Sequence, residues 1–251
     1  MLVGISLCAQ TAATSRAHCA AIDAQSDALF QQGESLYRRG IFRQALPSLM
    51  EAAKRGHPRA QALIGAMYWN GRGVPKDLQQ SAYWYTKAAA QGHRAAQYNL
   101  AGLYEMGAGG LPKDMVKSAQ LLEASARQDY PEAQFALGVD YEFGEGVARS
   151  RRTAIDWLDQ AANHGSDDAR MLTRWLRQPN TPQFATEREL AQYIASKLYP
   201  QPAASRNQDG GQLPLYHSMR EAFAPENSLP VAARWHRFNT CLANRTHPAC
   251  Y

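Results

Sequence analysis

The stretch YWNGRGVPKD, from Tyr68 to Asp77, combines closely spaced glycines with an arginine and a lysine, as a phosphate-binding loop would. Such a loop follows a strand and continues as G-K-S or G-K-T, and neither condition is met here. Related stretches return as YEMGAGGLPKD (104–114) and YEFGEGVARS (141–150), which favours a recurring turn over a single active site. We therefore expect unusual backbone dihedrals at Gly71 and Gly73, and a helix start aided by Pro75 and Asp77.

Other catalytic chemistry finds no support in the sequence. It contains no H-E-x-x-H, no G-x-S-x-G and no S-x-x-K with K-T-G. His57 and His93 each follow a glycine that ends a predicted helix, so we assign both to the structure of the repeat. Glu105 and Glu142 could form an acid/base pair, but they belong to different repeats and are predicted to line a groove. We predict no enzyme activity, no catalytic residue, no metal site and no cofactor.

The cysteines suggest an oxidising compartment. Cys241 and Cys250 lie nine residues apart and could close a small disulfide loop, which persists in a compartment such as the periplasm. His236 and His247 lie nearby, but the spacing of these four residues matches no familiar zinc pattern. We predict the disulfide Cys241–Cys250 and leave the fate of Cys19 open.

The two ends of the chain differ in composition. Residues 1–9 are apolar and are followed by small and polar residues, as in a secretory signal without its basic start. We predict a signal peptide or disordered N-terminus over residues 1–20 and a periplasmic or secreted protein, with a cytoplasmic one as the alternative. Residues 170–251 hold ten basic and five acidic residues, which accounts for the whole net charge of +5. This excess is either a solvated surface or a site for anionic partners.

Internal repeats determine the architecture. Ala-Gln pairs begin at Ala60, Ala96 and Ala133, at steps of 36 and 37 residues. Each copy predicts a short helix, the glycine loop and a second helix, with a glycine such as Gly92 just past its end. One copy cannot bury its apolar faces alone, so stacked copies are needed to form a core.

These copies resemble the Sel-one-like repeat family, which is related to tetratricopeptide repeats. The unit AQALIGAMYWNGRGVPKDLQQSAYWYTKAAAQGH follows the family pattern A-x-x-x-L-G-x-x-Y-x-x-G-x-G-V closely, and residues 28–56 are more similar to a tetratricopeptide repeat. The resemblance implies an all-α fold, a right-handed α-α superhelix or solenoid with a C-terminal helical extension. The expected organisation is a solenoid over 26–178, with units 26–59, 60–95, 96–132 and 133–168, a capping helix over 169–178, and an extension over 179–251 with a linker near 200–214.

The same resemblance implies a concave groove lined by the first helix of each unit. The inward positions of this register are Phe30, Glu34, Tyr37, Trp69, Asn70, Tyr98, Glu105, Phe135 and Glu142. Their aromatic and acidic character suits a peptide or helix with apolar anchors and some basic character. The alternative is that several of the aromatic residues only pack against the next unit.

Beyond the repeats, Thr186 and Glu189 form a capping-box pattern, followed by an apolar stripe that includes Leu190 and Ile194. This helix is expected to shield the end of the solenoid. A last helix around 232–242 is expected to fold back as a cap, or else to contact an anionic surface.

The sequence thus predicts a non-catalytic scaffold or adaptor of the bacterial periplasm or envelope. It would bind one or more proteins through the concave groove and no specific nucleic acid, and it could associate peripherally with the envelope. The alternatives are an enzyme acting on cell walls or β-lactams, and a membrane-surface or polyanion-binding module. The oligomeric state stays open.

Overall fold

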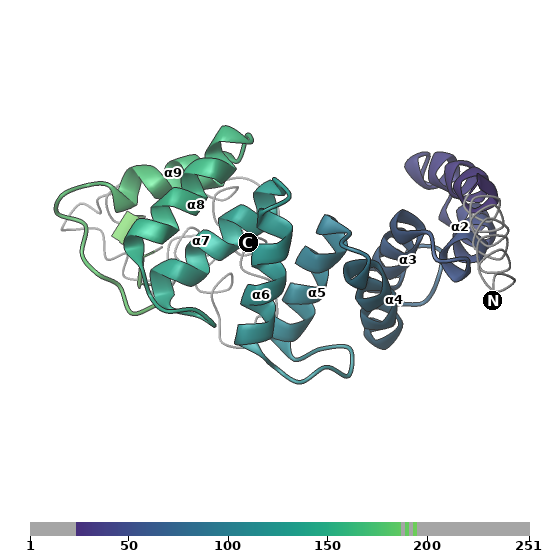
Figure 1. Ribbon diagram of the computed structural model, residues 1–251, viewed down its shortest axis with the longest axis horizontal. Coiled ribbons are helices and arrows are strands. Elements are labelled where there is room, and N and C mark those ends of the chain that lie inside the picture. Colours follow the sequence, from purple (N-terminus) through teal and green to yellow (C-terminus); the bar gives the residue numbers. More distant parts are fainter. Residues whose placement is uncertain (1–23, 187–188, 191–192, 195–251) are drawn as a thin grey trace, which may run out of the picture. The chain divides into compact units, whose positions relative to one another are not determined.

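The computed structural model describes residues 24–186, 189–190 and 193–194, and these residues form helices and connecting turns without any β-strand (Figure 1). They divide into two compact units. Unit 1 extends to Leu100 and includes Gly109–Leu111, and unit 2 comprises Ala101–Ala108 and the described residues from Pro112 onward. Within each unit, helices that follow one another in sequence pack together. This confirms the predicted fold class, an all-α fold of stacked helix pairs as in α-solenoids.

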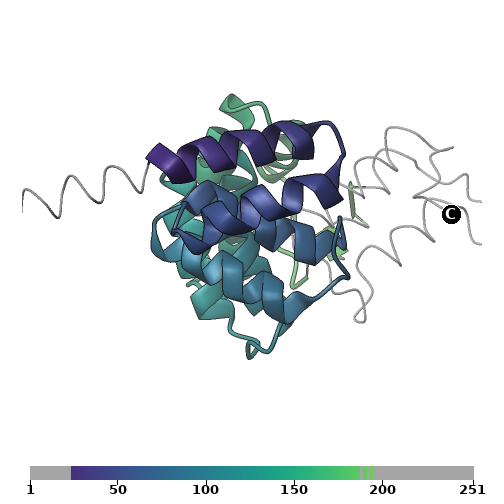
Figure 2. The same cartoon turned by 90° about the vertical axis from the view of Figure 1, so that its right-hand side faces the viewer.

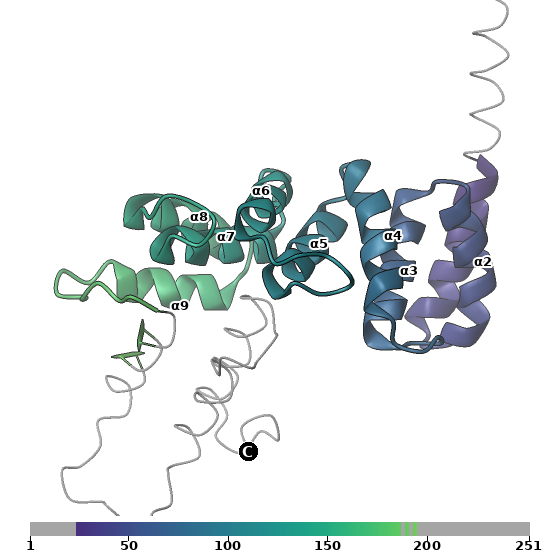
Figure 3. The same cartoon turned by 90° about the horizontal axis from the view of Figure 1, so that it is seen from below.

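Unit 1 begins with a helix over residues 24–38. It is followed by α2 (Phe42–Lys54), α3 (Pro58–Asn70), α4 (Leu78–Ala90) and the first half of α5 (Arg94–Met106). The view of Figure 2 places the 24–38 helix and α2 side by side, and Figure 3 shows α3 against α4. The core between these helices is built from buried apolar residues, namely Phe30, Ala45, Leu49, Ala52, Ala53, Ala60, Ile64, Met67 and Trp84.

Unit 2 contains the second half of α5, followed by α6 (Met115–Ala126), α7 (Pro131–Phe143), α8 (Arg151–Asn163) and α9 (Asp167–Leu176). Helix α7 packs on both α6 and α8, and α8 packs on α9. Nine residues of α7, 133–140 and Glu142, are buried, so this helix forms the centre of the unit.

Small residues allow the two helices of a pair to approach closely. A Cβ atom at Gly65 of α3 would lie 2.8 Å from the ring of Tyr85 on α4. At the equivalent Gly138 of α7, a Cβ atom would lie 2.7 Å from Leu158 on α8. Real Cβ atoms do not come this close to their neighbours, so glycine is required at both positions for the observed packing.

The glycine loops are turns between helices, as predicted. Gly71 and Gly73 have φ angles of 66° and 75°, which glycine adopts without steric cost. Asp77 caps α4, because its carboxylate accepts hydrogen bonds from the backbone N–H groups of Gln79 and Gln80 at 2.9 and 3.0 Å. The loop therefore serves to reverse the chain and start the second helix.

After α9 the chain turns at 177–180, has no regular secondary structure at 181–184 and bends at 185–186. It is helical at 189–190 and 193–194. The predicted cap at Thr186 is present, since its hydroxyl oxygen accepts a hydrogen bond from the backbone N–H of Glu189 at 3.3 Å. The Glu189 carboxylate in turn accepts from the N–H of Ala185 at 2.8 Å. Leu190 and Ile194 are fully buried, which places the predicted apolar stripe inside unit 2.

Candidate functional site

The first-helix side of unit 1 presents charged side chains at the N-terminal end of α3. Arg59 lies with its guanidinium carbon 4.5 Å from the centre of the Phe30 ring and donates a hydrogen bond to Glu34 at 2.9 Å. Arg38 donates to the same Glu34 oxygen at 3.0 Å. The side chains of Arg38 and Arg59 are 73% and 56% exposed, whereas that of Glu34 is 21% exposed. Two arginine side chains are therefore exposed to solvent here, and the acid between them is largely covered.

The same side of α3 continues with small and aromatic residues. Arg59, Ala66 and Asn70 follow one another at helical spacing, so they lie along one face of the helix. Ala66 is half-buried, and the exposed Asn70 donates its side-chain amide to the Ala66 carbonyl at 2.9 Å. Trp69 is half-buried beside Lys76, whose ammonium lies 5.9 Å from the ring centre.

Six of the nine sequence-predicted partner-binding residues are accessible at least in part. They are Glu34, Tyr37, Trp69, Asn70, Tyr98 and Glu105. Among these, Tyr37 packs edge-on against Phe42 with ring centres 5.1 Å apart. Their role in binding stays a prediction.

The other three predicted residues are buried within their own unit. Phe30, Phe135 and Glu142 expose only 2%, 3% and 1% of their surface. The ring of Phe30 stacks on His57, with centres 4.3 Å apart, and is covered on the solvent side by Arg59. In this structure, Phe30, Phe135 and Glu142 support their surroundings and have no surface to offer a partner. Both phenylalanines are thus packing residues, and whether they pack against the next unit, as the alternative proposed, stays a prediction.

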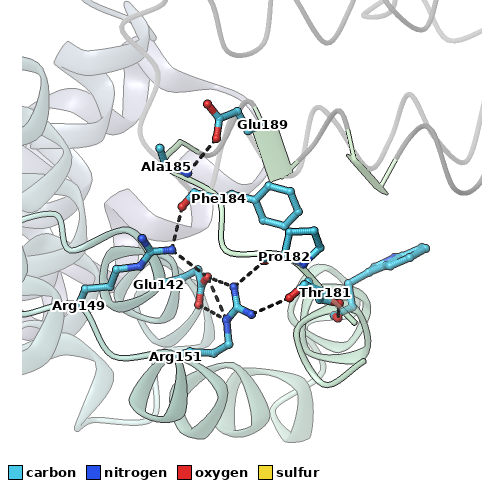
Figure 4. Close-up of polar contacts among 9 residues, drawn as sticks. Glu142, Arg149, Arg151, Thr181, Pro182, Phe184, Ala185 and Glu189 are labelled. Carbon is cyan, nitrogen blue, oxygen red and sulfur yellow. Dashed lines mark hydrogen bonds and ion pairs between the residues drawn. The ribbon is translucent and has the colours of Figure 1, made fainter. Parts of the chain in front are cut away.

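Glu142, at the end of α7, organises a polar cluster that sequence reasoning did not foresee (Figure 4). Arg151 donates to its carboxylate through Nε, at 3.1 and 3.2 Å, and through Nη2 at 2.6 Å. Arg149 lies 3.5 Å from the same carboxylate. Both arginines also donate to backbone carbonyls of the segment after α9: Arg151 to Thr181 and Pro182 at 3.2 and 3.0 Å, and Arg149 to Phe184 at 2.8 Å. We call Glu142, Arg149 and Arg151 the arginine clamp.

A second unforeseen feature is a series of buried glutamines. Gln61, Gln97 and Gln134 donate to the carbonyls of Ala53, Ala89 and Ala126, each eight residues earlier. These carbonyls lie at the ends of second helices, and each also accepts from the backbone N–H three residues later, that of Gly56, Gly92 or Asp129. The glutamines thus join consecutive repeats. The recurrence of the Ala-Gln pair was the only sign of these bonds in the sequence. It indicated the repeat but did not show that the glutamine side chain binds a carbonyl of the preceding helix.

The two repeat histidines have structural positions, as expected. The Nδ1 atoms of His57 and His93 accept hydrogen bonds from the backbone N–H groups of Ala60 and Ala96 at 3.2 and 3.3 Å, which caps the following helices. Burial lowers the pKa of both imidazoles below 6.5. For His57 this outweighs the opposite effect of Asp27, whose carboxylate lies 3.0 Å from Nε2.

The part of the chain that the structure describes contains no group of three His, Cys, Asp or Glu residues that could hold a metal ion. No helix in that part is both long and apolar enough to cross a bilayer. The predicted disulfide Cys241–Cys250, the signal-like N-terminus, the linker near 200–214 and the helix around 232–242 lie outside the described residues.

The family model of the Sel1 repeat matches residues 58–93, 94–130 and 131–166. No match was found among curated proteins. A Sel1 repeat protein from Oxalobacter formigenes, known from its crystal structure, is 26% identical with a TM-score of 0.58, and the match covers 86% of each chain.

A second crystal structure is that of c5321, described as a protective antigen present in uropathogenic Escherichia coli strains and displaying an SLR fold. It is 24% identical with a TM-score of 0.60, and the match covers 90% of this chain but 47% of that one. At this identity the likeness concerns the fold alone.

The matched segments begin at the first residue of α3, α5 and α7. Each ends one residue after the positive-φ residue that follows the second helix, namely Gly92, Asp129 and Gly165. The family pattern therefore coincides with the observed helix pairs. Residues 58–166 of this chain are three consecutive Sel1 repeats, as the sequence resemblance predicts.

Proposed function

We propose that this protein is a non-catalytic adaptor that holds a segment of a partner protein against the first-helix side of unit 1. Sel1 repeats are a protein-interaction scaffold fold and are generally non-catalytic. The observation that carries the proposal is the combination, on one side of α3, of exposed cations with the half-buried ring of Trp69. Aromatic and arginine side chains are the residues most enriched among those that dominate binding energy.

The charge on this side changes the kind of partner that the sequence suggested. A basic partner was expected because acids appear among the predicted groove residues. Glu34, however, is already paired with Arg38 and Arg59, and Glu142 is buried in the arginine clamp. The exposed charge around Glu34 is therefore that of Arg38 and Arg59. We propose a partner peptide or helix with an apolar or aromatic anchor and at least one carboxylate.

The proposed location is the periplasm or another compartment of the bacterial envelope. Its support is the signal-like composition of residues 1–20 together with the closely spaced Cys241 and Cys250. Fractionation of cells that produce the full chain, with and without residues 1–20, tests this proposal. The proposal is supported if the full chain is exported and the chain without residues 1–20 is not. It is contradicted if both chains stay in the cytoplasm to the same extent.

The binding proposal is tested with the full chain as bait in an extract of its own organism, followed by affinity measurements with the purified partner. The test variant carries Trp69→Ala and Tyr98→Ala. The matched control is Tyr83→Ala, which removes an aromatic ring that is 48% exposed on α4, a second helix. Circular dichroism and thermal melting check that all the variants are folded.

We expect the double variant to weaken binding about 30-fold or more, because anchor residues commonly contribute about 2 kcal/mol or more and 1.4 kcal/mol corresponds to a factor of ten. The Tyr83→Ala control should bind as the unchanged chain does. Binding that is lost with Tyr83→Ala but kept by the double variant would overturn the proposal. Turnover of a wall fragment or β-lactam by the purified chain would instead favour an enzyme.

A further inference from the structure

The segment after α9 repeats the hydrogen-bonding pattern of the Sel1 units, although the family match ends at residue 166. The buried glutamines donate to a carbonyl eight residues earlier, and Arg170 of α9 donates to the Ala162 carbonyl, also eight residues earlier, at 3.4 Å. Arg170 is therefore in the position of Gln134 one repeat later. Helix α9 occupies the place of a first helix.

The cap at Thr186 continues the same series. Asp77, Asp114 and Ser150 each accept a hydrogen bond from the backbone N–H three residues later and start α4, α6 and α8. Thr186 accepts from the N–H of Glu189 in the same way and follows Ser150 by 36 residues. The described residues Thr186, 189–190 and 193–194 thus take the position of a second helix.

Burial agrees with this register. The fourth residue after each cap is 0–1% exposed, and these residues are Ser81, Ser118, Ala154 and Leu190. The eighth residue after each cap is at most 3% exposed, and these residues are Tyr85, Leu122, Leu158 and Ile194. Leu190 and Ile194 therefore bury the same face of their helix as the second helices of the other pairs do.

The loop of this pair is fastened differently. In the Sel1 repeats, the second loop glycine approaches the first residue of an earlier helix so closely that a Cβ atom on Gly146 would lie 2.0 Å from the Met115 carbonyl oxygen. The equivalent position after α9 is Pro182, and the equivalent helix start is Arg151, which donates to the Pro182 carbonyl at 3.0 Å. The arginine clamp therefore holds by hydrogen bonds a loop that has no glycine to fit against the helix (Figure 4).

We propose that α9 and the described residues of 181–194 form a fifth, degenerate helix pair that closes the end of the repeats, and that the arginine clamp holds it in place. Each pair of a solenoid presents a face that fits the next pair, so an uncovered last face fits a pair of another copy of the same chain. The closing pair therefore prevents a second copy of the chain from binding to the face of the last repeat. The polar fastening, in place of a glycine contact, makes this pair separable from the repeat before it.

The test compares Arg151→Gln with the control Arg152→Gln, which changes the neighbouring exposed arginine. Because Arg151→Gln also leaves Glu142 without its main partner, a second variant, Leu190→Glu, opens the closing pair without touching the clamp. Hydrogen exchange by mass spectrometry measures the amides of 181–194, α7 and α8. Light scattering after size-exclusion chromatography measures the molar mass over a range of concentrations.

We expect Arg151→Gln and Leu190→Glu to speed exchange at 181–194 at least tenfold while α7 and α8 keep their protection, and to raise the average molar mass relative to Arg152→Gln. Unchanged exchange at 181–194 in both variants would overturn the fastening. Equal loss of protection in α7, α8 and 181–194 with Leu190→Glu would show one indivisible unit and overturn the separable closing pair. Faster exchange without a rise in mass would overturn the exclusion of a second copy.

Discussion

At the scale of single residues, the polar groups of this chain mostly serve to join helices. Gln134 is fully buried, donates to the Ala126 carbonyl at 3.1 Å, and contacts the Nδ1 atom of His164 through its own oxygen at 2.8 Å. The Ala126 carbonyl also accepts from the backbone N–H of Asp129, so the Gln134 side chain is its second donor. The same geometry at Gln61 and Gln97 shows that this is a property of the repeat.

We expect Gln134→Ala to lower the free energy of unfolding by about 1–3 kcal/mol, because it removes two side-chain hydrogen bonds, each worth about 0.5–1.5 kcal/mol. The control is Gln160→Ala, since Gln160 is exposed and donates only to the Asp156 carbonyl within its own helix. Urea denaturation followed by circular dichroism measures both. Equal effects of the two changes would show that the buried bond contributes nothing beyond helix propensity.

The histidine caps predict how stability depends on pH. The pKa values of His57 and His93 are lowered in the folded chain, mainly by burial. Between these lowered values and 6.5 the unfolded chain binds more protons, so a fall in pH favours unfolding. The contribution is complete above about pH 6.5 and is lost as the pH falls through the folded pKa values.

We therefore expect the melting temperature to fall as the pH is lowered below about 6.5, and to fall less in a variant with His57→Asn and His93→Asn. Asparagine keeps a capping oxygen but does not titrate. Calorimetry at a series of pH values measures the slope. A slope that is the same in both proteins would contradict the assignment to these histidines.

At the scale of elements, the repeat could be predicted where the sequence contains residues with special backbone or capping properties. Gly71, Gly73 and Asp77 act as the pattern indicates, and the first-helix and second-helix assignment follows from them. Phe135 and Glu142 were predicted to line the groove but are buried. The sequence shows which face of a helix a residue lies on, but not whether a neighbouring helix covers that face. The clamp was not visible in sequence since Arg151 and Pro182 are joined through a main-chain carbonyl, which has no residue signature.

The residue just past each second helix tests whether a left-handed backbone favours glycine, because the repeats carry different residues there. Gly92 follows α4 with a φ angle of 80°, and Asp129, in the same position after α6, has a φ angle of 56°. A side chain disfavours this left-handed conformation by about 1 kcal/mol. We expect Asp129→Gly to raise the free energy of unfolding by about 0.5–1 kcal/mol and Gly92→Asp to lower it by a similar amount.

Denaturant midpoints of these two variants provide the measurement. The Asp129 side chain is 73% exposed and lies 4.0 Å from His164, so little is lost with it. A decrease in stability with Asp129→Gly would mean that this contact outweighs the strain of the backbone.

At the scale of the whole molecule, the chain is organised by stacking of similar helix pairs, and this much is present in the spacing of its sequence. What it binds depends on surface charge, which the pairing of Glu34 with Arg38 and Arg59 reverses from the expected acidic character. That pairing joins α3 to the 24–38 helix, so only the fold reveals it. Because these arginines are exposed, the salt dependence of partner binding tests this charge directly.

We expect binding of the partner to weaken as ionic strength rises, because its carboxylate would face Arg38 and Arg59 at an exposed site. A variant with Arg38→Gln and Arg59→Gln should show a smaller dependence on salt than the unchanged chain. Titrations at several salt concentrations measure it. A partner that binds more tightly at high salt would contradict an acidic character.

The most direct test of the central claim is site-specific crosslinking. A photoreactive phenylalanine derivative is placed at Tyr98, on a first helix, or at Tyr83, on a second helix, and the full chain is irradiated in an extract of its organism. An adaptor that binds through first helices is expected to crosslink one partner from position 98 and not from position 83. Crosslinking of that partner from position 83 alone would contradict the claim.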